Sequence, residues 1–131
     1  MVFSIIGGML VLLQYLYFSV EVGRARGRTG VAAPAVSGNE EFERYYRAQL
    51  NTAEQLVIFG PALFASAWLI GDLYGAVFAA VFFVGRALYF RNYVREPGSR
   101  GPGMLLTMIG NLALILGGLV GAVLKLVAPV I

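Results

Sequence analysis

Four long runs of apolar residues follow one another along the chain, with short polar segments between them. A helix needs roughly 20 mainly apolar residues to cross the hydrocarbon layer of a membrane. Four runs are long enough, and they cover about residues 2–22, 42–71, 73–96 and 102–128. The chain contains no internal repeat. The sequence therefore predicts an all-α integral membrane protein, in which residues 1–131 form a single up-down bundle of four transmembrane helices.

Two of the three connections carry residues typical of loops and helix ends. In the first, GRARGRTGVAAPAVSGNEEFER (residues 23–44), either Ser37 or Asn39 is expected to cap the following helix. The third, REPGSRGPG (residues 95–103), contains Pro97, which ends one helix, and Pro102, which suits the first turn of the next. Glycines that allow close approach between helices recur in the last run, namely Gly110, Gly117, Gly118 and Gly121.

The composition narrows the possible chemistry. Hydrophobic residues make up 59% of the chain and charged residues 13%, far from the balance of a soluble domain. Cysteine and histidine are absent, which excludes disulfides, thiolate metal sites and a cysteine nucleophile, and removes the commonest general base. We expect no metal, and any thiol must come from another molecule. The first run lacks a basic leader and a cleavage site, so we expect it to be retained.

The net charge of +3 reflects where the basic residues lie. The basic residues near the first connection are Arg24, Arg26, Arg28, Arg44 and Arg47, and those near the third are Arg86, Arg91, Arg95 and Arg100. By the positive-inside rule these two connections face the cytoplasm, and in a bacterium the membrane would be the plasma (inner) membrane. Because topology accounts for the basic residues, we expect no nucleic-acid partner.

A polar stripe opens the second run. A helical wheel at about 100° per residue places four polar side chains within one quadrant, namely Arg44, Arg47, Asn51 and Glu54. An ionised group inside a membrane costs about 3 kcal/mol or more, so the stripe should face a wet cavity, with Glu54 paired to Arg47. Alternatively, the arginines extend to the lipid headgroups and the other two residues join helices. Gln49 lies on the opposite side of the wheel.

The third run repeats the arrangement near its end. Arg86, Tyr89 and Tyr93 share one helical face, although tyrosines at a membrane boundary also form ordinary aromatic belts. Arg100 follows in the third connection. Together these residues predict a cavity lined by guanidinium groups, phenols, an amide and a carboxylate. Such a cavity suits a small anionic or zwitterionic molecule that bears carboxylates and an amino group.

Three segments of the chain resemble a known family. They are YFSVEVGRAR (residues 17–26), EFERYYRAQLNTAEQ (residues 41–55) and GRALYFRNYVREPGSR (residues 85–100). The ER-x-x-RAQ-x-N-x-x-E core is the most specific of these features. With four expected spans, the chain is similar to the membrane-associated proteins in eicosanoid and glutathione metabolism (MAPEG), and within that family to the leukotriene C synthases and microsomal glutathione transferases.

The resemblance implies a homotrimer that binds glutathione between neighbouring subunits near the cytosolic membrane boundary. It implies that one subunit supplies Arg47, Asn51, Glu54, Tyr89, Tyr93 and Arg100, and that the next supplies Arg26 and Gln49. Arg100 matches the catalytic arginine that stabilises the glutathione thiolate. A free thiol titrates near 8.5, and an adjacent cation lowers that value, so that the nucleophilic form is present at neutral pH.

The implied activity is glutathione transfer to lipophilic electrophiles, or reduction of lipid hydroperoxides. Gln55 stands where leukotriene C synthases have a glutathione-binding tyrosine, and Gly27 stands where they have a second arginine. The chain also ends at Ile131, without the longer tail of some relatives. These differences favour a general transferase or peroxidase over leukotriene synthesis. The alternatives are a non-catalytic lipid-binding scaffold like the lipoxygenase-activating protein, and a small proton-coupled exporter with a membrane glutamate.

Overall fold

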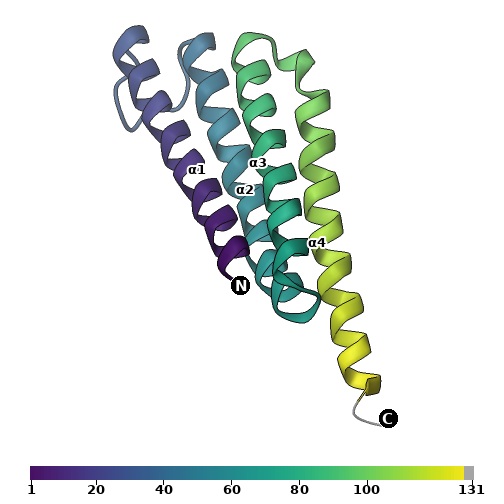
Figure 1. The fold of residues 1–131 in the computed structure, drawn as a ribbon. Helices are drawn as coiled ribbons and strands as arrows, with labels where there is room; N and C mark the ends of the chain where they lie inside the picture. The colour runs from purple at the N-terminus through teal and green to yellow at the C-terminus, as the bar shows by residue number, and fades with distance from the viewer. Residues whose placement is uncertain (129–131) are drawn as a thin grey trace.

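The protein is an all-helical bundle, described here from a computed structural model for residues 1–128. Its helices are α1 (Val2–Thr29), α2 (Glu40–Leu69), α3 (Asp72–Arg95) and α4 (Gly101–Val127), with a short 3₁₀ turn, η1 (Pro97–Ser99), before α4. Successive helices run in opposite directions, so the first and third connections lie at one end of the bundle (Figure 1). The predicted all-α, up-down arrangement is therefore confirmed.

The helices pack with α2 and α3 at the centre. Helix α1 contacts α2 and α3, and α4 contacts the same two helices from the other side (Figure 1). By length and composition, α1, α3 and α4 are the three helices of the described chain that are apolar enough to cross a membrane. The sequence predicts four such spans. Helix α2 is not among the three, and its first half carries most of its charged side chains.

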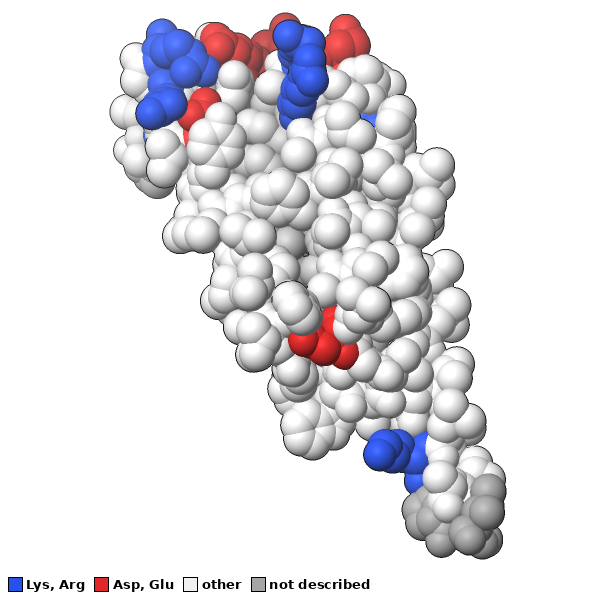
Figure 2. Space-filling model, in the orientation of Figure 1, with Lys and Arg blue, Asp and Glu red and all other residues white. Residues whose placement is uncertain are grey.

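Charged and apolar side chains are separated along the bundle. Acidic and basic side chains gather at the end that holds the first and third connections, above a largely uncharged surface (Figure 2). Large apolar side chains are exposed along the helices, for example Leu13, Val57 and Leu105. An apolar exterior of this extent is what a lipid environment requires, because lipid tails replace water around it.

Helix α1 is longer than the sequence predicts. Residues 23–29, which we expected in the first loop, continue the helix to Thr29. Ala25 is fully buried in a cluster with Val22, Val31 and Phe42, and these apolar contacts stabilise the last turns of α1. The helix ends at Gly30, whose φ of 75° is the left-handed conformation that glycine adopts at helix ends. Packing against α2 thus outweighs the low helix propensity of the glycines in this segment.

The helix ends otherwise follow the sequence. Asn39, rather than Ser37, caps α2, since its side-chain oxygen accepts a hydrogen bond from the Phe42 amide at 3.0 Å. Helix α3 ends at Arg95, before Pro97, and Pro102 lies in the first turn of α4. The capping oxygen and the two prolines are therefore confirmed in their expected roles.

At the other end of the bundle, Asp72 joins α3 to α1. Its carboxylate accepts hydrogen bonds from the backbone amides of Phe3 at 2.9 Å and Ser4 at 2.7 Å. The Ser4 hydroxyl donates in return to the Asp72 carbonyl at 2.8 Å. An anion is stabilised at a helix N-terminus, where the amides lack partners within the helix. The start of α1 is thereby fixed to the α2–α3 turn.

Candidate functional site

A cavity of about 360 Å³ lies between α2, α3 and α4 towards the charged end of the bundle. Its lining residues are Asn51, Glu54, Gln55, Arg86, Tyr89, Arg100, Met104, Thr107 and Met108. Four of the predicted site residues are thus brought together, namely Asn51, Glu54, Tyr89 and Arg100. The volume lies within the range of about 300–1,000 Å³ typical of small-molecule pockets.

Arg86 is the most deeply placed charge in this cavity, with 1% of its surface exposed. Its Nε and Nη2 donate to the Thr52 hydroxyl at 3.2 and 2.8 Å, and Nη1 donates to the Thr107 hydroxyl at 3.3 Å. Each threonine hydroxyl in turn donates to a carbonyl of its own helix. Within residues 1–128 no carboxylate forms an ion pair with Arg86. A fixed positive charge without an ion-pair partner among the described residues therefore faces the cavity.

Stacked rings connect Arg86 to Arg100. The Arg86 guanidinium lies 4.0 Å from the centre of the Tyr89 ring, and Tyr89 stacks on Tyr93 with ring centres 5.5 Å apart. The Arg100 guanidinium lies over Tyr93 at 6.0 Å. We call these four residues the cation–aromatic column. The Tyr89 hydroxyl also accepts a hydrogen bond from Asn51 Nδ2 at 2.6 Å, which links the column to α2.

Two glycines let α3 and α4 approach closely beside the column. A Cβ atom on Gly103 would lie 2.6 Å from the Tyr89 Cα and 2.8 Å from the Gly85 carbonyl oxygen. A Cβ atom on Gly85 would lie 2.8 Å from the Thr107 amide nitrogen. Real Cβ atoms do not approach other atoms so closely, so this crossing requires glycine on both helices. The crossing sets the distance between Tyr89 and the start of α4.

The predicted pair between Glu54 and Arg47 is wrong. Both side chains are exposed, and neither forms an ion pair with any described residue. The two residues are seven positions apart, which is about 10 Å along a helix. Glu54 lines the cavity, whereas Arg47 lies about one turn from Asn51, outside its lining. Tyr93 lies beside the cavity, in the cation–aromatic column.

Arg26 and Gln49 lie on a different face of the bundle. Arg26 donates to the carbonyls of Ala35 at 2.7 Å and Val31 at 3.4 Å, and its guanidinium stacks on Phe42 at 4.6 Å. Gln49 Nε2 donates to the Ser19 hydroxyl of α1 at 2.8 Å. Both residues therefore belong to the α1–α2 face, and neither reaches the cavity of its own chain.

Three polar residues line the cavity beyond the glutathione-binding set that the resemblance implies, namely Gln55, Arg86 and Thr107. The helical face shared with Tyr89 and Tyr93 had already grouped Arg86 with the predicted cavity, and the resemblance had marked Gln55 as a departure at a glutathione-binding position. Thr107 had no signal, since single polar residues in apolar runs are common. Gln55 accepts a hydrogen bond from Asn111 Nδ2 at 3.0 Å and ties α2 to α4 below the cavity. Among the described residues, no cluster of three or more acidic side chains could hold a metal ion.

The chain is similar in sequence to known proteins. The MAPEG family matches residues 4–120. The chain is 38% identical over 117 residues to an uncharacterised protein of Synechocystis, covering 89% of this chain and 85% of that protein. It is 37% identical over 107 residues to human microsomal glutathione S-transferase 2, covering 82% and 72% of the two chains.

A second named enzyme matches a shorter part of the chain. Bovine leukotriene C4 synthase is 37% identical over 90 residues, which cover 69% of this chain and 59% of that enzyme. The family match spans most of the chain; it includes α2 and α3, most of α1 and α4, and every residue of the cavity. The chain belongs to the MAPEG family, a family of membrane-embedded proteins.

Proposed function

We propose that the protein is a membrane-bound glutathione transferase. One observation carries the proposal: two guanidinium groups, a carboxylate, two amides and a phenol line a single cavity of about 360 Å³ at the charged end of the bundle. Its similarity to microsomal glutathione S-transferase 2 and leukotriene C4 synthase supports the same activity.

The chemistry of glutathione fits these side chains. Glutathione carries two carboxylates, one ammonium group and one thiol. Guanidinium groups bind carboxylates in a bidentate manner, and a carboxylate such as Glu54 binds an ammonium. Asn51 and Tyr89 add hydrogen-bonding groups, although their mutual bond at 2.6 Å occupies one donor. A scaffold that only presents lipid has no use for this set of groups.

Arg100 is the proposed catalytic residue. Its guanidinium is exposed at the cavity rim, held over Tyr93. A cation at this place lowers the pKa of a bound thiol, so that the proton leaves to solvent and the thiolate remains. The sulfur then forms a bond to an electrophilic carbon of a lipophilic substrate, whose leaving group or added electron pair takes up a proton. The same thiolate can attack the terminal oxygen of a lipid hydroperoxide, which breaks the O–O bond and, after protonation, releases the lipid alcohol. The resulting glutathione sulfenic acid then condenses with a second glutathione to give the disulfide and water.

The cavity is open on one side, and we propose that a neighbouring subunit completes it. Arg47, Asn51, Glu54, Tyr89, Tyr93 and Arg100 would come from one subunit of a homotrimer, and Arg26 and Gln49 from the next. The placement of Arg26 and Gln49 on the α1–α2 face supports this division. We further propose that α2 spans the membrane as a fourth helix of one domain, since it packs along all three apolar helices. The positive charge near the first and third connections supports a cytoplasmic position for both, by the positive-inside rule.

Titration of the purified protein with glutathione, followed by thiolate absorbance, tests the proposal. A thiol with a pKa near 8.5 is about 3% ionised at pH 7, and we expect a much larger bound fraction. Arg100→Ala should lower the ionised fraction of bound glutathione to that of the free thiol. Arg24→Ala, at an exposed residue outside the cavity, should leave the ionised fraction unchanged. Absence of bound thiolate in the unmodified protein would refute the catalytic role and favour a lipid-binding scaffold. The mass of the intact complex in detergent tests the trimer separately.

A further inference from the structure

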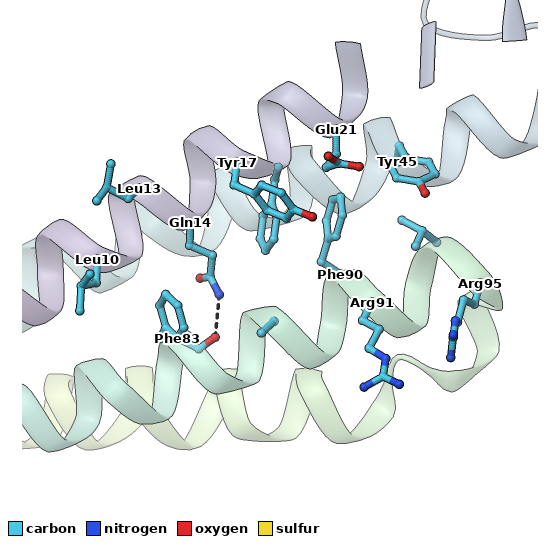
Figure 3. A pocket seen from close by; sticks show the side chains of 13 residues that line it. Leu10, Leu13, Gln14, Tyr17, Glu21, Tyr45, Phe83, Phe90, Arg91 and Arg95 are labelled. Atoms are coloured by element: carbon cyan, nitrogen blue, oxygen red, sulfur yellow. Dashed lines mark hydrogen bonds between the residues drawn. The ribbon is translucent and has the colours of Figure 1, made fainter. Parts of the chain in front are cut away.

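A second hollow lies on the face of the bundle between α1 and α3. It is a groove of about 710 Å³ lined by those two helices and by Tyr45 of α2 (Figure 3). None of its lining residues lines the cavity between α2, α3 and α4. The proposed function makes no use of this groove.

The groove changes from apolar to charged along its length. Leu10, Leu13 and Phe83 line one end, and Arg91 and Arg95 lie at the other (Figure 3). The two arginines are one helical turn apart on α3, at the end of the bundle where charged side chains gather. An elongated groove of this kind matches a molecule with one long apolar part and one anionic group.

The charged end has a surplus of positive charge. Glu21 also lines the groove, but it forms an ion pair with Arg24 at 2.9 Å. Within residues 1–128, neither Arg91 nor Arg95 donates a side-chain hydrogen bond or forms an ion pair. Two guanidinium groups are therefore available to an anion from outside the chain.

The floor of the groove is held in place by a buried contact. Gln14 of α1 donates from Nε2 to the Phe83 carbonyl of α3 at 2.8 Å (Figure 3). Phe18 of α1 stacks on Phe90 of α3 with ring centres 4.1 Å apart and an interplanar angle of 2°. These contacts fix the spacing of α1 and α3, so the groove is a built feature of the fold.

We propose that this groove binds one anionic glycerophospholipid. The phosphate lies against Arg91 and Arg95, and an acyl chain follows the apolar end past Leu13 and Phe83. Basic pockets between membrane helices on the cytoplasmic side recognise anionic headgroups in this way. A zwitterionic headgroup carries a cation that the two arginines repel. Glu21, the carboxylate nearby, is already paired with Arg24 and does not bind that cation. A zwitterionic lipid should therefore bind the groove more weakly than an anionic one.

The groove also lies away from the proposed subunit contacts. The cavity opens between α2 and α4, and Arg26 and Gln49 lie on the α1–α2 face, so the proposed shared site uses both sides of α2. The groove lies on the α1–α3 face. The groove therefore lies outside the proposed shared site, and the proposal does not depend on glutathione binding.

Native mass spectrometry of the purified protein in detergent tests this proposal. Dioleoyl phosphatidylglycerol is titrated against dioleoyl phosphatidylcholine, which has the same acyl chains. We expect tighter retention of phosphatidylglycerol, weakened about fivefold by Arg91→Gln or Arg95→Gln and roughly 30-fold by both together. Equal retention of the two lipids, or a double variant that binds like the unmodified protein, would overturn the proposal.

Three further measurements separate the groove from general attraction to positive charge. Lys125→Gln removes one charge in the last turn of α4 and should leave retention unchanged, whereas a loss equal to that of Arg91→Gln contradicts a local site. Ala87→Phe fills the groove at an exposed lining position and should weaken retention with both arginines present. If Ala87→Phe has no effect, or if glycerol 3-phosphate displaces the lipid, the groove does not hold the acyl chain.

Discussion

Replacing Gly103 by alanine tests the contact that sets the geometry of the candidate site. The added Cβ would lie 2.6 Å from the Tyr89 Cα and 2.8 Å from the Gly85 oxygen, and closer still to the Tyr89 nitrogen. Carbon atoms normally approach to about 3.5–4.0 Å. All three contacts are with backbone atoms, which cannot rotate away as a side chain can. Helices α3 and α4 must therefore separate by about 1 Å.

The expected cost follows from this displacement. Overpacking of a close contact costs about 1–3 kcal/mol, and the better helix propensity of alanine offsets about 1 kcal/mol of it. We therefore expect Gly103→Ala to lower the free energy of unfolding by up to about 2 kcal/mol. Gly23 is the matched control, because it lies in α1, is exposed, and an added Cβ would meet no heavy atom of a described residue within 4 Å beyond its own turn of helix. Gly23→Ala should stabilise the protein by about 0.5–1 kcal/mol.

Thermal unfolding in detergent, followed by circular dichroism, compares the two variants. Glutathione affinity is measured in parallel, since separating α3 from α4 moves Tyr89 away from Arg100 and should weaken binding. The same substitution thus has opposite effects on stability at the two positions. If Gly103→Ala unfolds at the same temperature as Gly23→Ala or above it, the close α3–α4 crossing is refuted.

Two further substitutions have defined outcomes. Asn39→Ala removes the cap of α2 and should cost about 0.5–2 kcal/mol, visible as faster hydrogen exchange of the Phe42 amide, whereas Ser37→Ala should leave that exchange unchanged. Arg86→Met keeps most of the buried volume and leaves both threonine hydroxyls bonded to their backbone carbonyls, so the unfolding temperature should change little. Calorimetry should show that the variant binds glutathione at least about fivefold more weakly, because one of the two cations of the cavity is lost. A lower unfolding temperature with unchanged glutathione affinity would show that Arg86 has only a structural role.

Sequence patterns predict the helical bundle well because lipid leaves few choices. Apolar runs of spanning length must be helical, and Asn39, Pro97 and Pro102 act locally, so their roles are visible without a fold. The end of α1 was missed because it depends on a distant contact, the packing of Ala25 against Phe42. The glycines of residues 23–29 favour a loop, but packing between helices keeps this segment helical.

The site is only partly visible in the sequence for a similar reason. A helical wheel groups Asn51 with Glu54, and Arg86 with Tyr89, because those pairs share one helix. A shared face is not a contact: Arg47 and Glu54 are seven residues apart, about 10 Å along the axis, and this separation rules out the ion pair that we predicted. Nor does the wheel show Thr107, which meets Arg86 only where Gly85 and Gly103 bring α3 and α4 together. Contacts between helices are the part that patterns cannot supply.

The cation–aromatic column has a consequence for the range of molecules that the site can accept. At its inner end Arg86 is immobilised by two hydroxyls, whereas the Arg100 side chain makes no hydrogen bond within residues 1–128 and rests on the Tyr93 ring. A cation–π contact does not fix one donor and one acceptor, while a hydrogen bond weakens steeply once its geometry is lost. In the proposed function, Arg100 can therefore shift with the position of the glutathione sulfur and stay near the same ring. A rigid inner charge combined with a movable outer one then favours breadth of substrate shape over selection of a single electrophile.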